Sequence, residues 1–445
     1  MRVLLIQTKT LFDEPPIFPL GLASIGAILV KKGYRVYTLD LNIGLGGPRS
    51  IERAIRRIRP DVIGVSIRNI KNARPGIHRS SMPDHQRMLK DIRSAAPDAV
   101  IVTGGSGFSL YAEQLMDAIP EIDFGVFAEA EETFPKLLSS LNSPRDIPGV
   151  YVRNGSEIIF TGRHNLPDFP SLPLPKRSLF DVPAYMNASM GIGIQAKRGC
   201  VLDCIHCSNH YLFEKRLRVR EPGAVVDEIE SLIKDYGLRQ FVFADEIFNI
   251  PDTHAREICE HIIRRNLQVS WTGWFKEKQL SEESALLFKR AGCYALLFSP
   301  DVAADQLFSL WGKGLTEADL YRSMEIVDKT GLRAEWNFML NGPGETWNTA
   351  KKMAVFLGHA SIKLKRRMHA SSYVPVSLRI YPHSRVQDVA IERGLISGDD
   401  ELVDPVHYNP PPISRVANPI IFAMGSAWRA RQFLRSVLKP GGYRD

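Results

Sequence analysis

The stretch GIGIQAKRGCVLDCIHC, from Gly191 to Cys207, joins an apolar, strand-like run to a group of three cysteines. Cys200, Cys204 and Cys207 are separated by three and then two residues, and the whole chain of 445 residues has only five cysteines. Thiolate sulfur is a soft ligand that selects zinc or iron–sulfur clusters. The spacing therefore predicts a metal site in the loop that follows a strand.

The two remaining cysteines do not supply the second ligand couple that a structural zinc site usually has. Cys259 lies in a helical pattern and Cys293 opens a strand pattern, so we interpret both as buried cysteines. A zinc site completed by His206 or His210 stays an alternative, as do three thiols that bind no metal. We favour a four-iron cluster held by three thiolates, since full protein ligation would need a fourth cysteine. The open iron would then bind a substrate or cofactor.

Strand and helix patterns alternate around the cysteines from about residue 190 to about residue 382. The strand candidates are GIGIQAK, FVFADEIF, QVSWTGWF, CYALLFS, RAEWNFML and ASSYVPVSLRIY. Six βα units in order predict an incomplete (β/α)6 barrel, with its chemistry at the carboxyl ends of the strands. We assign residues 188–385 to this barrel and residues 386–445 to a small, α-rich C-terminal extension.

The first 142 residues show a second alternation. Strand runs that are apolar throughout, such as RVLLIQ (2–7) and DVIGVSI (61–67), are separated by helical patterns such as PLGLASIGAILVKKG (19–33). This pattern predicts an α/β domain with a doubly wound parallel sheet, whose ligand lies beyond the carboxyl ends of the strands. Residues 143–187 contain a predicted hairpin around Asn154-Gly155 and a proline-rich stretch that we interpret as a linker.

Composition restricts the class of protein further. The net charge of +8, from 57 basic and 49 acidic residues, is spread along the chain and does not favour a nucleic-acid partner. No apolar run reaches the roughly 18 residues that a membrane span needs. The opening RVLLIQ predicts a buried strand rather than a signal peptide. Few cysteines and no disulfide framework favour a reducing compartment, so we expect a cytoplasmic protein.

The C-x3-C-x2-C loop after the first strand of a partial barrel resembles that of the radical S-adenosylmethionine (SAM) enzymes. The resemblance implies a [4Fe-4S] cluster on Cys200, Cys204 and Cys207, with the methionine part of SAM on the fourth iron. It also implies that His206 lies beside the adenine. An electron from the cluster would cleave SAM to a 5′-deoxyadenosyl radical.

Two further motifs are similar to those of the same family. NGPGET (341–346) resembles its Gly-Pro-Gly-Glu turn, which implies that Gly342, Gly344 and Glu345 lie near the adenosyl group. FSPDVAADQLFSLWGKGLT (298–316) resembles the stretch after its fourth strand, with Asp301 in the place of a glutamate that contacts the ribose or methionine.

Other candidates for catalytic residues come from the ends of predicted barrel strands. Asp245 and Glu246 end the second strand in FADEIFN (243–249), at a rim where carboxylates are commonly functional. Tyr373, Arg379 and Tyr381 lie on the predicted sixth strand and are candidates for a wall of the substrate pocket.

The first domain carries a second resemblance. PLGLASIGAILVKKGYRVYTLDLN (19–42), VTGGSGFS (102–109) and DFGVFAEAEETF (123–134) are similar to the cobalamin-binding domain fused to many radical SAM enzymes. The residues expected to bind cobalamin are Pro19, Gly21, Ser66, Arg68, Asn69, Gly104, Gly105, Ser106, Gly107 and Glu129.

Two features depart from cobalamin-binding patterns. No histidine follows the first strand, so cobalamin is expected without a histidine lower ligand, and Arg68 is expected near that face. The Gly-Glu-Gly-Glu segment of the family reads Ala-Glu-Ala-Glu here, at residues 128–131.

Together the resemblances imply a cobalamin-dependent radical SAM enzyme. We expect it to methylate a carbon of a small molecule of the secondary-metabolite type through methylcobalamin, with electrons from a reducing partner such as flavodoxin or ferredoxin. Radical cyclisation, ring contraction or rearrangement with the same cofactors stays an alternative. A cobalamin-free radical SAM enzyme and a non-catalytic iron–sulfur or zinc protein are further alternatives.

Overall fold

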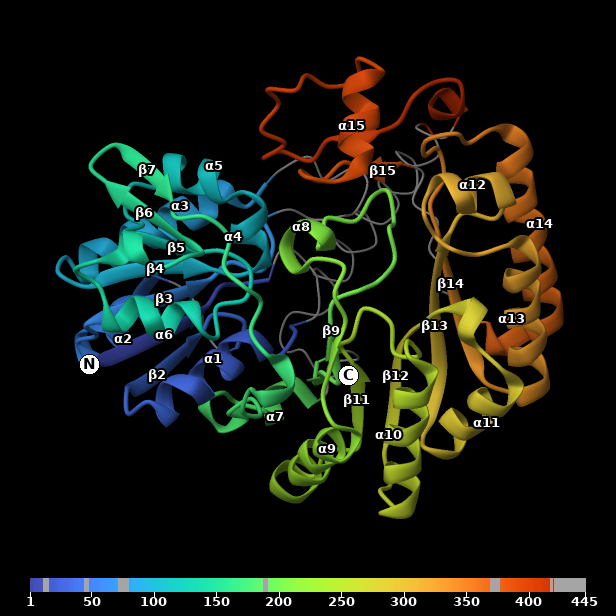
Figure 1. Cartoon of the computed structure of the whole chain (residues 1–445), viewed down its shortest axis with the longest axis horizontal. Coiled ribbons are helices and arrows are strands. Elements are labelled where there is room, and N and C mark those ends of the chain that lie inside the picture. The colour runs from blue at the N-terminus through green and yellow to red at the C-terminus, as the bar shows by residue number, and fades with distance from the viewer. Residues whose placement is uncertain are drawn as a thin grey trace, which may run out of the picture.

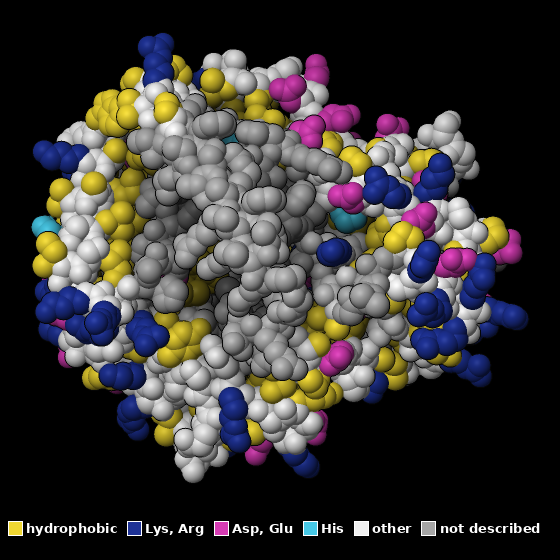
Figure 2. Space-filling view, turned by 180° about the vertical axis from the view of Figure 1, so that it is seen from behind, with side chains coloured by type: hydrophobic (Ala, Val, Ile, Leu, Met, Phe, Trp, Pro, Cys, Tyr) yellow, Lys and Arg dark blue, Asp and Glu magenta, His cyan; other side chains and the backbone are white. Residues whose placement is uncertain are grey.

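A computed structural model of the chain describes residues 1–10, 16–43, 48–70, 80–186, 191–368, 377–416 and 419. Figure 1 shows two parts side by side, an N-terminal domain in blue and teal and a barrel domain in yellow and orange, with α8 (Asn209–Phe213) between them. Seen from behind, Lys and Arg side chains lie around the edge of the molecule with Asp and Glu among them (Figure 2). The face drawn there shows basic side chains dispersed rather than collected in one patch.

The N-terminal domain is built on a sheet with the strand order β2-β1-β3-β4-β5-β6-β7. Its parallel strands are β1 (Arg2–Gln7), β2 (Arg35–Asp40), β3 (Val62–Ser66), β4 (Val100–Gly104) and β5 (Phe124–Val126). Its helices are α1 (Leu20–Lys31), α2 (Pro48–Ile58), α3 (Met82–Ala95), α4 (Ser106–Leu110), α5 (Ala112–Ala118) and α6 (Thr133–Ser139). Because α1 contacts α6 while α2 contacts α3, two helical layers cover the sheet, which confirms the doubly wound prediction. The strand order reverses beside β1, which places a ligand-binding crevice at the carboxyl ends of β1 and β3.

The hairpin around Asn154-Gly155 is confirmed, but it belongs to a different part of the molecule than we expected. β6 (Val150–Asn154) pairs antiparallel with β7 (Glu157–Phe160) and also with β5, after the short helix η1 (Pro144–Asp146). The hairpin therefore continues the first sheet beyond residue 142. A turn motif predicts that two strands pair, but not which sheet edge they extend.

Residues 161–186 connect the domains and contact both of them. The connection contains η2 (Phe169–Ser171), η3 (Arg177–Leu179) and α7 (Pro183–Met186). The Lys176 amide donates to the Ala23 carbonyl of α1 at 3.0 Å. The buried Arg177 guanidinium bonds Glu228 at 2.7 Å and the Gly193 carbonyl at 2.6 Å in the barrel domain. The proline-rich stretch is thus fixed along its length rather than a free tether.

The barrel domain has a parallel sheet whose strands follow chain order. The strands are β8 (Gly193–Ile194), β11 (Gln240–Phe243), β12 (Ser270–Phe275), β13 (Cys293–Asp301) and β14 (Arg333–Phe338). The helices that cover it are α9 (Pro222–Tyr236), α10 (Asp252–Arg264), α11 (Glu282–Arg290), α12 (Asp305–Leu310), α13 (Glu317–Thr330) and α14 (Trp347–Leu364). Short 3-10 helices are η4 (Glu277–Gln279) and η5 (Lys365–Arg367). Capping boxes at Ser281, Thr316 and Thr346 start three of the helices, since each side chain accepts from a backbone N–H of the first turn.

The predicted sixth strand differs from the expectation over its described part. Residues 369–376 lie outside the described residues, and β15 (Leu378–Arg379) pairs antiparallel with β16 (His407–Tyr408) in a separate small sheet. One parallel bridge between Ala334 and Met368 is all that continues the barrel sheet beyond β14 among the described residues. The C-terminal extension begins with α15 (Arg385–Glu392).

Candidate functional site

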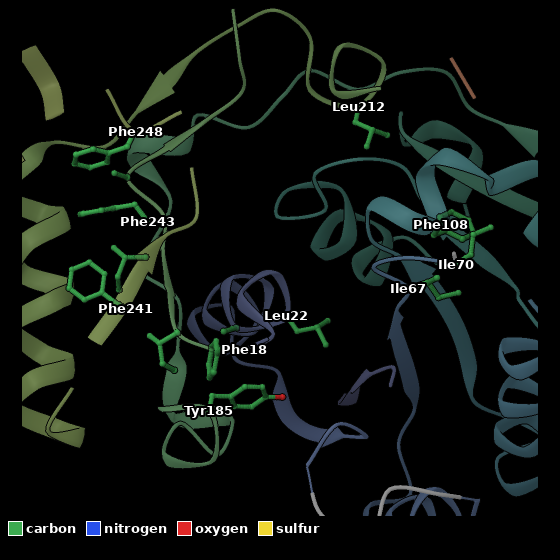
Figure 3. Close-up of a cluster of buried hydrophobic side chains, with 14 of the residues drawn as sticks. Phe18, Leu22, Ile67, Ile70, Phe108, Tyr185, Leu212, Phe241, Phe243 and Phe248 are labelled. Carbon is green, nitrogen blue, oxygen red and sulfur yellow. The ribbon is translucent and has the colours of Figure 1, made fainter. Parts of the chain in front are cut away.

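A cavity of about 710 Å³ lies between the N-terminal domain and the barrel domain. The N-terminal wall is formed at the carboxyl ends of β1, β3 and β4 and at the start of α1. The opposite wall contains α8 (Asn209–Phe213) and the loop that carries the three cysteines. In Figure 3, Leu22 on α1 and Leu212 on α8 extend toward this space from two sides. We call it the interdomain cavity.

Many of the residues predicted to bind cofactors, and two of those predicted to be catalytic, line this cavity. From the N-terminal domain these are Pro19, Gly21, Ser66, Arg68, Gly104, Gly105, Ser106 and Glu129. From the second half of the chain these are His206, Cys207, Glu246 and Tyr381. Asn69 and Gly107 lie just behind the N-terminal wall, because Gly107 packs directly on the Asn69 backbone.

Backbone forms much of the N-terminal wall because two loops pack together there. Gly105 has φ +100°, and a Cβ there would lie 2.7 Å from the Ile67 carbonyl oxygen. A Cβ on Gly107 would lie 2.7 Å from the Asn69 nitrogen. The Ser106 hydroxyl donates to the carbonyl of Arg68 at 2.9 Å. Larger residues at either glycine would separate the loops after β3 and β4, so this wall needs glycine for its shape.

Residues 128–131 line the cavity and also contact the barrel domain. Ala128 adopts φ +55°, a conformation that favours glycine, and Ala128 and Ala130 both line the cavity. Glu129 also lines the cavity, and its carboxylate is paired with Arg198 at 2.7 Å and with Arg218. Burial opposes the charge on Glu129, but the two guanidinium groups outweigh it and hold its pKa below the ordinary value.

The cysteine loop, residues 200–207, is closed by a short antiparallel ladder. β9 (Lys197–Arg198) leads into the loop, and β10 (Arg218–Val219) returns from α8 to pair with it. The Ile205 amide donates to the Trp311 carbonyl at 3.0 Å, and the Ile205 carbonyl accepts from Val386 at 2.9 Å. Gly312 has φ +65° and no side chain, which lets the Asp203 carbonyl pack against it. The loop is thus held from three sides.

The three thiols of this loop lie near one another and are partly buried. Burial raises the pKa of Cys207 to about 11 and also raises that of Cys200, and the neighbouring thiols add to both shifts. Such thiols gain strongly from a metal that stabilises the thiolate. Among the described residues, no three His, Cys, Asp or Glu side chains converge on a single-ion site. A four-iron cluster takes each thiolate on a different iron, so the three thiols do not need to converge on one point to hold it.

A buried set of charges lies next to the cysteine loop. Asp301, fully buried with φ +66°, bonds the Lys313 ammonium at 2.6 Å and the Ser299 hydroxyl at 2.6 Å. Although burial opposes the charge of Asp301, Lys313 and His206 outweigh it and lower its pKa. The His206 Nε2 atom lies 3.6 Å from Asp301, and burial lowers the pKa of the imidazole. The predicted contact residue Asp301 therefore has a lysine partner that the sequence analysis did not identify.

Asp245, a predicted catalytic residue, faces the backbone that leads into the cysteine loop. Its carboxylate is buried and accepts from the backbone amides of Ala196 at 2.8 Å and Lys197 at 3.1 Å, and it does not line the cavity. Burial raises its pKa above the ordinary value and lowers that of the buried Lys197 ammonium. Asp245 thus holds the backbone ahead of the cysteine loop, and its catalytic role stays a prediction. Glu246 does line the cavity, and burial raises its pKa.

The Gly-Pro-Gly-Glu turn lies outside the cavity lining. A Cβ on Gly342 would overlap the Trp311 ring, and Gly344 has φ +78° beside Leu310. Glu345 accepts from the Asn341 amide at 2.5 Å, and burial raises its pKa to about 7. These contacts give the two glycines and the glutamate a role in closing the turn against the 310–312 segment. Their contact with SAM stays a prediction.

The candidates on the predicted sixth strand are only partly described. Arg379 is buried, and its guanidinium lies over the Tyr381 ring, 4.2 Å from the centroid. Tyr381 lines the cavity and Arg379 does not. Tyr373 lies outside the described residues.

The sequence analysis missed four charged residues that the structure brings to the site. Arg198, Arg218, Glu131 and Lys313 are all largely buried and ion-paired. Their signal was available in part, since Arg198 directly precedes the cysteine motif and Lys313 lies in the Gly-Lys-Gly segment. Their partners lie 12 to 89 positions away, so spacing alone did not reveal the pairs.

The geometry defines a two-domain α/β enzyme with a ligand cavity between a doubly wound sheet and a cysteine-bearing partial barrel. Comparison with family models agrees: residues 14–138 match the B12 binding domain, and residues 194–357 match the radical SAM superfamily. The chain belongs to the cobalamin-dependent radical SAM enzymes, those that carry a B12-binding domain.

Two relatives illustrate the range of the similarity. An uncharacterized methyltransferase of Pyrococcus horikoshii is 26% identical over 386 residues, which are 85% of this chain and 79% of that protein. The anaerobic magnesium-protoporphyrin IX monomethyl ester cyclase of Cereibacter sphaeroides is 25% identical over 75% of this chain but only 55% of its own length.

A solved structure has the same fold. The radical SAM methyltransferase TsrM from Kitasatospora setae, solved with cobalamin and a [4Fe-4S] cluster, superposes with a TM-score of 0.76 at 22% identity. The superposition covers 88% of this chain and 75% of that chain. Within the described part of our chain, no helix has both the length and the apolar character that a membrane crossing requires.

Proposed function

We propose that the protein methylates a carbon atom of a small-molecule substrate, with cobalamin and SAM as cofactors. The observation that carries the proposal is the interdomain cavity, because it is lined by the loop after β3, by the glycine-rich loop after β4 and by His206 and Cys207 of the cysteine loop. A reaction that needs two cofactors beside one substrate carbon requires both walls to face one space. When bound, cobalamin would supply the methyl donor, and the cluster would supply the electron that cleaves SAM.

The residues of the chain would divide the work between the two walls. Cys200, Cys204 and Cys207 would hold the cluster by one thiolate each. Gly104 and Gly105 would let cobalamin lie close to the backbone. The Arg198 and Asp245 side chains would keep the cysteine loop in place from behind, through contacts with Glu129 and with backbone amides.

Histidine is absent from the described lining on the side where cobalamin would bind. The one histidine among the described residues that line the cavity is His206, on the cysteine loop. Arg68 lines the N-terminal wall with an exposed side chain, and a cation there would discourage water from binding cobalt. Both features support a cobalamin without a histidine lower ligand.

The named relatives support methyl transfer to a small molecule. TsrM has been solved with its substrate tryptophan and a SAM analogue, and the Pyrococcus horikoshii relative is named a methyltransferase. We infer that electrons come from a small reducing protein of the flavodoxin or ferredoxin kind.

Anaerobic reconstitution with iron, sulfide and hydroxocobalamin tests the proposal. Mass analysis after reduction should find 5′-deoxyadenosine from SAM cleavage and S-adenosylhomocysteine from methyl transfer. Zinc in place of iron, or no 5′-deoxyadenosine under strong reductant, would contradict the proposed chemistry.

Radical cyclisation is the second candidate, because one set of relatives is named for a cyclase activity. A cyclase would form 5′-deoxyadenosine but would not convert SAM to S-adenosylhomocysteine. The same product analysis therefore separates the two functions.

A further inference from the structure

The two-stranded ladder of β9 (197–198) and β10 (218–219), which we call the neck, closes the cysteine loop. It places two largely buried arginines opposite each other. Arg198 of β9 and Arg218 of β10 are direct cross-strand partners in the two-stranded ladder, and Arg218 is 6% exposed. Gly199, with φ +86°, packs against the Arg216 carbonyl, which keeps the two strands close. Like charges placed opposite each other in a ladder are destabilising. The neck therefore requires counter-charges.

Both counter-charges come from the other domain. The Glu129 carboxylate bonds Arg198 at 2.7 Å and the Arg218 Nη1 atom at 3.0 Å, with a second contact to Arg218 Nη2. Glu131 bonds the Arg198 Nη2 atom at 2.6 Å. Two buried positive charges thus meet two buried negative charges across the domain boundary.

The barrel domain offers no ion-pair partner among the residues that the structure describes, although the Glu246 carboxylate acts on both arginines from a longer distance. Arg198 also donates to the Gln195 side chain at 2.9 Å and lies over the Phe169 ring, while Arg218 donates to the Pro167 carbonyl at 2.9 Å. These groups are uncharged. No other described carboxylate lies within ion-pair distance of either arginine.

We propose that Glu129 and Glu131 are positioning residues that close the neck of the cysteine loop, so that the loop takes its final shape only when the two domains are docked. The inference rests on the proposed function, because the two glutamates would hold the cobalamin site and the cluster site in one fixed arrangement. Removing the carboxylates leaves opposed, buried charges, which is strongly unfavourable. A displacement of about 1 Å between reacting groups lowers a rate by about 100-fold.

The first experiment uses the protein without cofactors. Trypsin cleaves after Lys215 and Arg216, which are exposed just before β10 and become good substrates when the neck opens. The double variant Glu129→Gln/Glu131→Gln should be cut there about tenfold faster than the unmodified protein. Glu325→Gln is the matched control, because it breaks an exposed ion pair with Lys363 and should leave the rate unchanged.

The second experiment uses the reconstituted protein. After loading with hydroxocobalamin, iron and sulfide and after reduction, pulsed electron paramagnetic resonance measures the distance between the cobalt(II) and cluster spins. The unmodified protein and the Glu325→Gln control should give one narrow distribution. The double variant should give a broader or longer one, or lose iron while it retains cobalamin.

Unchanged trypsin cleavage together with an unchanged distance distribution in the double variant would overturn the inference. Equal effects in the Glu325→Gln control would overturn it as well. If the double variant does not fold by circular dichroism, Glu131→Gln, which leaves Glu129 in place, is measured against the same outcomes. A failure of the unmodified protein to take up cofactors counts against the proposed function, whereas the trypsin experiment still decides the role of the glutamates.

Discussion

The two walls of the interdomain cavity are built on opposite principles. In the described part of residues 1–160, the only buried Asp, Glu, Lys or Arg side chains are Glu129 and Glu131, and both point to the barrel domain's arginines. The barrel domain instead buries many charged groups near its cysteine loop, among them Lys197, Asp245, Lys276, Glu277, Asp301 and Lys313.

The difference shows what each wall is suited to do. A wall of glycine and backbone accepts a large ligand through shape and through close approach. A wall with compensated charges buried behind it has a fixed internal field, which suits bond cleavage and the binding of a charged cofactor. Four substitutions test this contrast, and they follow in order of decreasing expected effect.

Cys204→Ala should abolish the chemistry of the barrel wall and leave the N-terminal wall intact. One thiolate fewer cannot hold the cluster, so 5′-deoxyadenosine formation should fall to background while cobalamin still binds. Mass analysis of SAM products and the visible spectrum of bound cobalamin measure the two properties. Cys259→Ala removes a buried thiol of α10 and should retain 5′-deoxyadenosine formation; a normal yield from Cys204→Ala would refute the cluster assignment.

Lys313→Met should destabilise the barrel domain. It leaves the fully buried carboxylate of Asp301 without its cation, which costs about 3–5 kcal/mol in the free energy of unfolding. Urea unfolding of the cofactor-free protein measures the loss. Lys363→Met breaks an exposed pair with Glu325 and should change the same quantity by about 1 kcal/mol at most. If Lys313→Met lowered the free energy of unfolding as little as Lys363→Met does, the buried pair would not be needed for stability.

Gly21→Trp should fill part of the cavity beside the N-terminal wall without disturbing the fold of that domain. Gly21 lines the cavity, and a Cβ there would meet no atom within 4 Å, so a large side chain fits the protein but occupies ligand space. We expect cobalamin affinity to fall about 100-fold, or about 2.7 kcal/mol, in a spectroscopic titration. Gly21→Ala adds only one methyl group and serves as the control. Tight cobalamin binding by Gly21→Trp would place the ligand elsewhere.

Ala128→Gly should stabilise the N-terminal domain slightly. The Ala128 backbone has φ +55°, which costs an L-residue about 1–2 kcal/mol, and glycine adopts it freely at a smaller entropic cost. The expected gain is about 1 kcal/mol or less, measured as a rise in the midpoint of thermal unfolding. Ala130→Gly is the control, since Ala130 has no positive φ; there the midpoint should fall.

The N-terminal wall was largely predictable from sequence, and the charged wall was not. Apolar strands followed by glycines indicate a sheet edge where the backbone can approach a ligand. This local pattern supported the prediction that Gly104 and Gly105 lie at a ligand site. The partners of Arg198 lie 67 and 69 positions away, and their pairing depends on how the domains dock. Asp245 seemed catalytic because it ends a strand, yet its carboxylate turns back to the Ala196 and Lys197 amides.

The anchored connection at residues 161–186 limits how the two domains can be exchanged between relatives. Its backbone bonds α1, and its Arg177 side chain bonds both Glu228 and the Gly193 carbonyl of β8. A chimera that grafts a foreign cobalamin-binding half onto this barrel must therefore transfer or rebuild the connector as well. We therefore expect the two domains and the connection to be inherited together.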